Sequence, residues 1–180
     1  MTIVGIDYSI TSPAICVFKG DNFTLENCTF YSLSDHRIDD FPTFNFRLHQ
    51  KQYLHDTERF RQIAEWACDC IRDGGTDLVG IEDYSMGSKG KVFNIAENCG
   101  MLKYTLWEQG HIFETVAPTV VKKFATGKGN SDKEKMYAQF VADTGFDLKH
   151  RIQPNRKLGA PTTDLIDAYY ICKYFVDKQK

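Results

Sequence analysis

The sequence has no long hydrophobic run. No apolar stretch approaches the ~18 residues that a membrane-crossing helix requires, so we expect no membrane segment. The N-terminus also lacks the basic-then-apolar arrangement of a signal peptide. The six cysteines are scattered, and Cys68 and Cys70 lie two apart in a helical pattern, where side chains diverge. We therefore expect reduced, mostly buried thiols and a cytoplasmic protein.

Internal repeats, low-complexity tracts and linker-like segments are absent as well. The chain has 180 residues, of which 42% are hydrophobic and 26% charged, as in globular proteins. This length is enough to bury a core. We expect one domain over residues 1–180.

The small net charge of −2 conceals an uneven distribution. Residues 1–83 contain 7 Lys and Arg against 14 Asp and Glu, whereas residues 84–160 contain 12 against 7. This difference predicts a basic face on an acidic body, which suits a polyanionic partner that approaches from one side.

Apolar patterning predicts strands first and then an alternation of helices and strands. Three early strands with short connections favour an antiparallel meander, and the later alternation favours parallel strands. Expected strands cover residues 3–7, 14–18, 22–33, 77–82 and 111–116. Expected helices begin at or near Asp56, Phe93, Pro118, Ser131 (a capping box with Glu134) and Pro161. The fold class is thus α/β: a mixed sheet of five strands, three antiparallel and then two parallel, flanked by helices.

Three segments have no clear pattern. Residues 34–55 are polar and rich in aromatics, and they form either a functional loop or a cover for a sheet edge, which we favour. Residues 85–91 and 149–158 are expected to form two basic loops.

Four acidic residues recur at equivalent places. Asp7 and Glu82 each end a short buried strand, and Asp164 and Asp167 share one face at the start of the last helix. Acids in a first helical turn are favourable to the helix dipole in any protein, but this does not explain the two strand ends. Clustered carboxylates repel one another and raise each other's pKa, and divalent hard cations such as Mg²⁺ remove that repulsion. A pair of such ions suits phosphodiester hydrolysis.

The chain resembles the RuvC family of Holliday junction resolvases, within the RNase H-like superfamily. The matching stretches are Ile3–Asp7, Gly80–Glu82, Thr126–Lys133 and Asp164–Ala168. The resemblance implies an RNase H-like fold, a homodimer, and metal-dependent cutting of four-way or other branched DNA junctions by paired symmetric nicks. Such an enzyme acts in DNA recombination and repair.

The resemblance also implies roles for single residues. Asp7, Glu82, Asp164 and Asp167 match the four catalytic acids that bind the metal, with two Mg²⁺ expected per site and Mn²⁺ able to substitute. Lys122 and Lys133 match lysines placed near the scissile phosphate, and of these two we expect Lys133 to be catalytic. The dimer interface falls on the helix over residues 93–107. We expect the apolar stripe of this helix to pack in the core, and Lys103, Tyr104 and Trp107 to form a second, aromatic face beside it. The stripe consists of Ile95, Cys99, Leu102 and Leu106. We expect phosphate contacts from Lys89, Lys91, Lys122, Lys128, Lys149, Arg151, Arg156 and Lys157.

The chain departs from the family pattern in two places. A junction-centre aromatic is expected three residues after the strand-four acid, but Ser85 occupies that position and Tyr84 precedes it. The segment 34–55 is also longer than expected. Both departures favour a divergent, phage-like or viral member, which would act in the host cytoplasm.

Other functions remain open. A related nuclease that cuts flaps, branched DNA or RNA–DNA hybrids would need the same acids, and a non-catalytic junction-binding protein is a further alternative. A sugar-kinase-like ATPase fits poorly, because Tyr8–Pro13 is no glycine-rich turn and 180 residues do not supply two lobes. Gly127–Ser131 lacks the spacing of a P-loop, so we expect no nucleotide cofactor.

Overall fold

The computed structural model describes residues 1–34, 46–50, 55–72, 75–84 and 92–180. The strands are β1 (Thr2–Asp7), β2 (Ala14–Lys19), β3 (Cys28–Ser34), β4 (Phe46–Gln50), β5 (Leu78–Glu82) and β6 (Phe113–Val116). The helices are α1 (Asp56–Arg72), α2 (Val92–Glu108), α3 (Pro118–Thr126), α4 (Lys133–Thr144), α5 (Leu148–Ile152) and α6 (Thr162–Lys178).

The strands form one mixed sheet in the order β4-β3-β2-β1-β5-β6. β1, β2 and β3 pair antiparallel, and β5 and β6 continue the sheet in parallel on the other side of β1. This arrangement confirms the predicted RNase H-like sheet of three antiparallel and two parallel strands.

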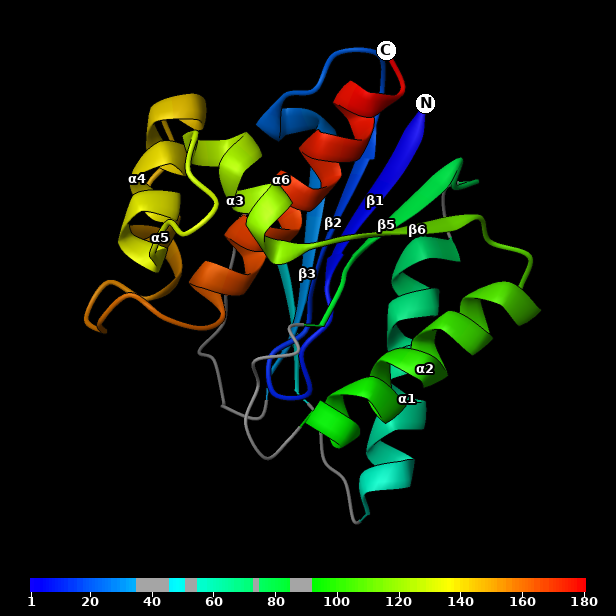
Figure 1. Ribbon diagram of the computed structural model, residues 1–180. Helices are drawn as coiled ribbons and strands as arrows, with labels where there is room; N and C mark the ends of the chain where they lie inside the picture. The colour runs from blue at the N-terminus through cyan, green and yellow to red at the C-terminus, as the bar shows by residue number, and fades with distance from the viewer. Residues whose placement is uncertain (35–45, 51–54, 73–74, 85–91) are drawn as a thin grey trace.

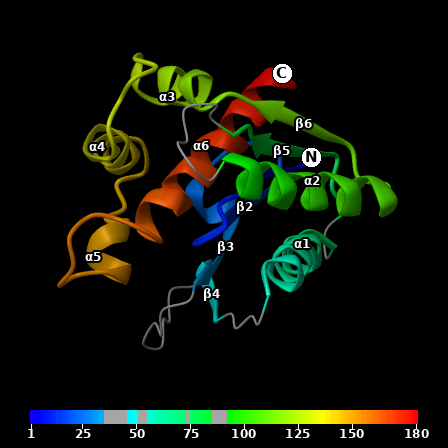
Figure 2. The same cartoon turned by 60° about the horizontal axis from the view of Figure 1, so that its bottom comes forward.

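A sixth strand extends the predicted sheet. β4 comes from the segment 34–55 and pairs in parallel with β3, beyond which it lies in Figure 2. The sequence carries a short apolar–polar alternation here, from Phe44 to His49, but it lies in a segment that otherwise has no pattern, and the strand was not predicted. The rest of that segment, 35–45 and 51–54, lies outside the described residues.

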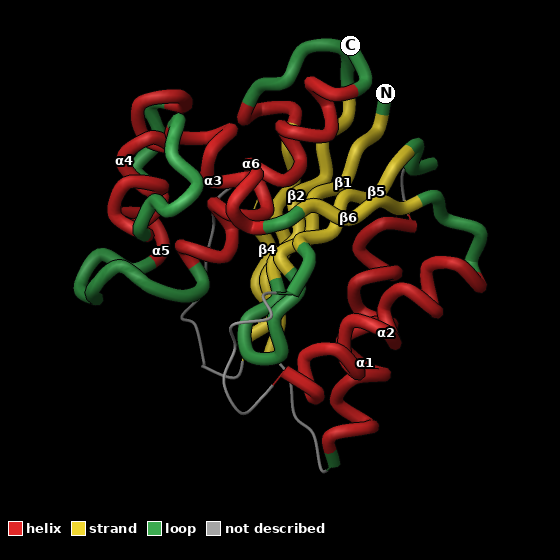
Figure 3. The backbone as a smooth tube through the Cα atoms, in the orientation of Figure 1, coloured by secondary structure: helices red, strands yellow, loops and turns green. Residues whose placement is uncertain are grey.

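Helices cover both faces of the sheet (Figures 1 and 3). One apolar cluster joins the sheet to α6 and to the smaller helices α3, α4 and α5. A second cluster joins the opposite face to α1 and α2. Successive side chains of a strand point to opposite faces, and both faces of this sheet are covered by helices. For this reason β1 and β5 are apolar almost throughout.

The alternation also determines where the strand acids point. In β1, Ile3 belongs to the α6 cluster and Val4 to the α1–α2 cluster, so Asp7 shares the face of Ile3. In β5, Leu78 belongs to the α6 cluster, and Glu82 lies four residues on, again on that face. Both acids therefore face α6.

Two local expectations need correction. Helix α4 is capped by Asp132, whose carboxylate accepts from the Lys135 N–H at 2.9 Å, and not by Ser131. The Ser131 hydroxyl instead donates to the Lys128 carbonyl at 3.0 Å and closes the preceding turn. The predicted basic loop 149–158 begins inside α5, because Asp147 caps a short helix that buries Leu148 and Ile152.

The cysteines agree with expectation. All six are free thiols, and five of them are buried. Among the described helices, none has the length and hydropathy of a membrane span.

Candidate active site

The four predicted acids gather at one end of the sheet. Asp7 and Glu82 end the adjacent parallel strands β1 and β5, and both face the first turns of α6, which carry Asp164 and Asp167. The structure thus brings together residues that are up to 160 positions apart in sequence, from Asp7 to Asp167. Their roles remain predictions from the residue pattern.

The four carboxylates interact electrostatically. Burial, and then the charges of Glu82, Asp164 and Asp167, raise the pKa of Asp7 well above its ordinary value. Burial and the charge of Asp167 raise the pKa of Glu82 to about 8. Burial and the charge of Asp164 raise the pKa of Asp167 to about 7. Burial is the first cause in each case, and repulsion among the acids adds to it, so these carboxyl groups keep their protons to higher pH than usual.

Two lysines oppose this charge from the α3–α4 side. Lys122, from α3, favours the charged forms of Glu82 and Asp167. Lys133, the first residue of α4, does the same for Asp7, Asp164 and Asp167. Both lysines lie beside Asp167 around a small pocket of about 50 Å³.

A hydroxyl connects Lys133 to the acids. The Lys133 ammonium donates to the Thr163 hydroxyl at 3.3 Å, and that hydroxyl donates to the Asp164 carboxylate at 3.1 Å. Thr163 is buried, so this contact orders both charged groups. Burial raises the pKa of Asp164, and the neighbouring Ser12 and Thr163 hydroxyls moderate the rise; the Ser12 hydroxyl lies nearby without full hydrogen-bond geometry.

The donor set fits a hard divalent cation. Carboxylate oxygens are the ligands Mg²⁺ takes in proteins, and the raised pKa values reflect burial and mutual repulsion, which a bound cation would offset. Within the described part of the chain, no three acid, imidazole or thiol side chains already converge in a ligand arrangement. Metal binding would therefore draw these side chains closer together.

The predicted phosphate-binding residues fall into two groups. Six of them, all described, lie on α3, on α5 or in the loops next to these helices, on the α6 side of the sheet: Lys122, Lys128, Lys149, Arg151, Arg156 and Lys157. Lys89 and Lys91 lie outside the described residues, as does Ser85. Tyr84 is described, and its ring lies 5.8 Å from the Lys103 ammonium.

Comparison with solved structures gives the fold. RuvC of Thermus thermophilus aligns with a TM-score of 0.62 at 16% identity, covering 99% of this chain and 96% of that one. The fowlpox virus resolvase in complex with Holliday junction DNA aligns with a TM-score of 0.56 at 15% identity, covering 99% of both chains. The yeast mitochondrial Holliday junction resolvase aligns with a TM-score of 0.58 at 11% identity, covering 98% of this chain and 78% of that one.

The chain has the fold of the RuvC resolvases. This confirms the RNase H-like resemblance at the level of structure. No family model matches the sequence, and no curated protein matches it. The RuvC fold is thus recognisable here in three dimensions although sequence identity is low.

Helix α2 presents the face that was predicted for the dimer. Cys99, Leu102 and Leu106 are buried, as the apolar stripe indicates. Tyr104 and Trp107 are 55% and 69% exposed, and their ring centroids lie 6.1 Å apart. Both aromatic side chains are therefore available on the surface of the described chain.

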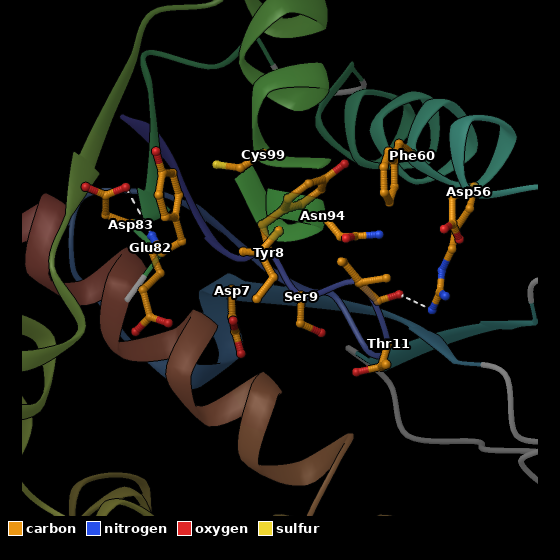
Figure 4. Close-up of a pocket in the computed structure, with 14 residues that line it drawn as sticks. Asp7, Tyr8, Ser9, Thr11, Asp56, Phe60, Glu82, Asp83, Asn94 and Cys99 are labelled. Atoms are coloured by element: carbon orange, nitrogen blue, oxygen red, sulfur yellow. Dashed lines mark hydrogen bonds between the residues drawn. The ribbon is translucent and has the colours of Figure 1, made fainter. Parts of the chain in front are cut away.

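Sequence reasoning missed a large pocket beside the acids. It measures about 660 Å³ and lies between the turn that follows β1, the start of α1 and the start of α2 (Figure 4). Its lining residues come from four separate segments, none of which has a recognisable motif, so only the folded chain reveals it.

Proposed function

We propose that this protein is a structure-specific endonuclease that cuts four-way DNA junctions by metal-dependent phosphodiester hydrolysis. The observation that supports it most is the cluster of Asp7, Glu82, Asp164 and Asp167 in a RuvC fold. No structural role requires four mutually repelling carboxylates at the ends of two strands and one helix. A nuclease does require them.

Asp7, Glu82, Asp164 and Asp167 would hold Mg²⁺, or Mn²⁺ in its place, with two ions per site. When bound, such ions neutralise the acids, activate water and stabilise the leaving oxygen. The fold of the chain supplies the rest of the site: it holds the acids on rigid strand and helix ends, which limits their movement during the reaction.

The two lysines would bind the scissile phosphate. Lys133 and Lys122 point their charge at the acid cluster from α4 and α3, so a phosphate bound to the acids through metal would meet both. Lys133 would donate to a non-bridging oxygen as charge develops there. The Thr163 hydroxyl accepts a hydrogen bond from the Lys133 ammonium and so holds that ammonium in place.

The DNA arms would run over the basic surface on the α3–α5 side. Among the neighbours in structure, RuvC of T. thermophilus and the fowlpox virus resolvase were each solved with a Holliday junction. Two symmetric nicks require two active sites, and a C₂ homodimer supplies them. We propose that the exposed face of α2, with Tyr104 and Trp107, forms its interface.

A metal-dependence assay tests the chemistry. We expect a labelled four-way junction to be nicked in Mg²⁺ or Mn²⁺, and to remain intact in EDTA or in Ca²⁺, whose ligand distances are longer. Asp7→Asn should abolish cutting but preserve junction binding, because it removes charge from the site. Asp21→Asn, in the exposed turn that follows β2, is the matched control. Undiminished cutting in excess EDTA would exclude the mechanism.

A further inference from the structure

The large pocket beside the acids has the build of a binding site. Its volume of about 660 Å³ lies within the roughly 300–1,000 Å³ that is typical of small-ligand pockets. Apolar and aromatic side chains line much of it, among them Tyr8 and Phe60, which are 7% and 6% exposed. Figure 4 shows the Asn94 amide reaching in from α2, between Phe60 and the turn that follows β1.

The turn that forms one wall is held firmly. Arg59 of α1 donates to the Ile10 carbonyl at 2.6 Å, and the Ser12 N–H donates to the Ser9 hydroxyl at 2.8 Å. The wall is therefore tied to α1 by a hydrogen bond to a charged group, which is the stronger kind. A preformed cavity of this sort loses little entropy on binding.

The two sides of the acid cluster differ in chemistry. Asp7 and Glu82 line this pocket, whereas Asp167 lines the small pocket on the other side, together with Lys122 and Lys133. The small pocket, about 50 Å³, has room for little more than a water molecule. A chemical group bound in the large pocket would lie next to a phosphate that reacts at the four acids.

Charge decides what kind of group that is. Among the described residues, the lining has four carboxylates and one guanidinium, from Asp7, Asp56, Glu82, Asp83 and Arg59. With Asp7 and Glu82 holding metal, Asp56 and Asp83 still outnumber Arg59, so this part of the lining favours a neutral, partly polar group over a phosphate. The phosphate backbone therefore belongs on the lysine side, and its bases can reach the aromatic side.

On the basis of the proposed nuclease function, we propose that this pocket receives an unstacked nucleobase of the strand being cut, adjacent to the scissile phosphate. Tyr84, which is 37% exposed, supplies most of the aromatic surface that the described lining offers to a base, and the largely buried Tyr8 and Phe60 add little. Asn94 offers both a donor and an acceptor to the edge of the base. A base is cheapest to extrude where pairing is already disturbed, which favours the centre of a branched junction over intact duplex. The pocket thus couples cutting to branched structure.

Abasic scanning combined with pocket variants tests this. The scissile phosphates are mapped first, and each of the nucleotides nearest to them is then replaced, one at a time, by an abasic nucleotide. Junction affinity is measured with Asp167→Asn, which leaves the pocket lining intact, and single-turnover cleavage with the wild-type protein. We expect one position to lose roughly 5- to 100-fold in affinity or rate, the range typical of base–aromatic stacking.

Two variants connect that position to the pocket. Ile95→Trp, in the Asp167→Asn background for binding, fills the cavity and should weaken the intact junction by a similar factor. In the Ile95→Trp protein, replacing that nucleotide by an abasic one should lower junction affinity by less than a further twofold. Asn94 is exposed, so the Asn94→Ala protein should fold normally. This variant should show a weaker preference among the four bases at the same nucleotide. Glu65→Ala, exposed on α1 and outside both the pocket and the proposed dimer face, should change neither.

Each outcome is informative. The pocket assignment would be wrong if the losses from Ile95→Trp and from the abasic nucleotide were fully additive. It would also be wrong if Asn94→Ala left the base preference unchanged. Neither result would contradict the proposed nuclease function. If Ile95→Trp fails to fold, the Asn94→Ala result decides alone. A protein that binds junctions and shows the coupling, but cuts no DNA, would contradict the proposed function and keep the pocket.

Discussion

Gly5 of β1 and Gly80 of β5 are paired in register directly beneath α6. A Cβ atom on Gly5 would lie 2.3 Å from the Cys172 backbone nitrogen and 2.4 Å from the Ala168 carbonyl oxygen. A Cβ atom on Gly80 would lie 2.0 Å from Cδ2 of Phe175. The missing side chains let α6 lie close against the two strands that end in Asp7 and Glu82, and this brings the helix acids to the strand acids.

Adding a methyl group at these glycines should therefore damage both stability and the site. Gly5→Ala meets backbone atoms, which cannot move aside, and should cost about 3 kcal/mol or more in the free energy of unfolding. Gly80→Ala meets the ring of Phe175, a buried side chain that must shift within the core, and should cost about 1–3 kcal/mol. Urea unfolding measures both, and cleavage rates measured on the folded fraction report the position of α6.

Gly100→Ala is the matched control. Gly100 lies in α2 with open space around it, so alanine should stabilise the protein by roughly 0.5–1 kcal/mol. Gly100 lies on the α2 face proposed for the dimer, so this control is used for stability alone and is measured in the monomeric Trp107→Glu background. If Gly5→Ala were as stable there as Gly100→Ala, the close approach of α6 would be wrong.

The raised pKa values predict how stability changes with pH. Glu82 titrates at about 8 in the folded protein against an ordinary 4.5, and Asp167 at about 7 against 3.8. The folded state thus binds protons more tightly than the unfolded state. Without metal, the free energy of unfolding should fall as pH rises from about 5 to 8, by a few kcal/mol in order of magnitude.

Mg²⁺ should reverse this loss, because it binds the ionised folded site and not the unfolded chain. Urea unfolding at pH 5, 6, 7 and 8, in EDTA and in Mg²⁺, measures both effects. Glu82→Gln should flatten the profile in EDTA. A stability that rises from pH 5 to 8 in EDTA would contradict the electrostatic account.

Much of this site was readable in the sequence. An acid at the end of a buried strand is unusual, and its recurrence at Asp7 and Glu82, with Asp164 and Asp167 one turn apart, indicated a shared location. Period-2 alternation then determines the face on which the strand acids lie. The main strands and helices follow from hydrophobic periodicity, since their burial is strong.

Other features depend on tertiary contacts that leave little local signal. β4 pairs in parallel with β3, and its short alternation lies in a segment without further strand signals. The sequence predicts Ser131 as the N-cap of α4, whereas Asp132 is the N-cap in the structure. Both residue types cap helices well, and the Ser131 hydroxyl is used in the turn before α4. The close approach at Gly5 and the large pocket exist only after distant segments meet.

The basic surface predicts a strong dependence of DNA affinity on salt. With Asp7→Asn bound to a junction, log Kd should change linearly with log salt concentration, because phosphate contacts release counterions. Lys128→Ala or Arg156→Ala should lower the slope by about 1 and weaken all sequences alike. Lys19→Ala, exposed at the end of β2, should leave the slope unchanged. Affinity that is independent of salt would contradict this surface.

The face of α2 predicts a dimer that one charge disrupts. Trp107 is 69% exposed in the isolated chain, and Phe93 on the same helix is 78% exposed. Large aromatic residues contribute much of the binding energy in interfaces, so Trp107→Glu should give a folded monomer in light scattering that nicks a single strand. Val120→Glu, at a 41% exposed apolar site on α3, should remain dimeric. A Trp107→Glu dimer that still nicks symmetrically would place the interface elsewhere.

The most direct test of junction cutting compares substrates side by side in Mg²⁺. A mobile four-way junction, a flap, a linear duplex and an RNA–DNA hybrid of matched sequence are incubated with the wild-type protein and with Asp7→Asn. We predict that the wild-type protein cuts the four-way junction fastest, with two symmetric nicks, and that Asp7→Asn binds the junction without cutting it. Equal or faster cutting of the linear duplex or the hybrid, or an Asp7→Asn protein with wild-type activity, would contradict the account.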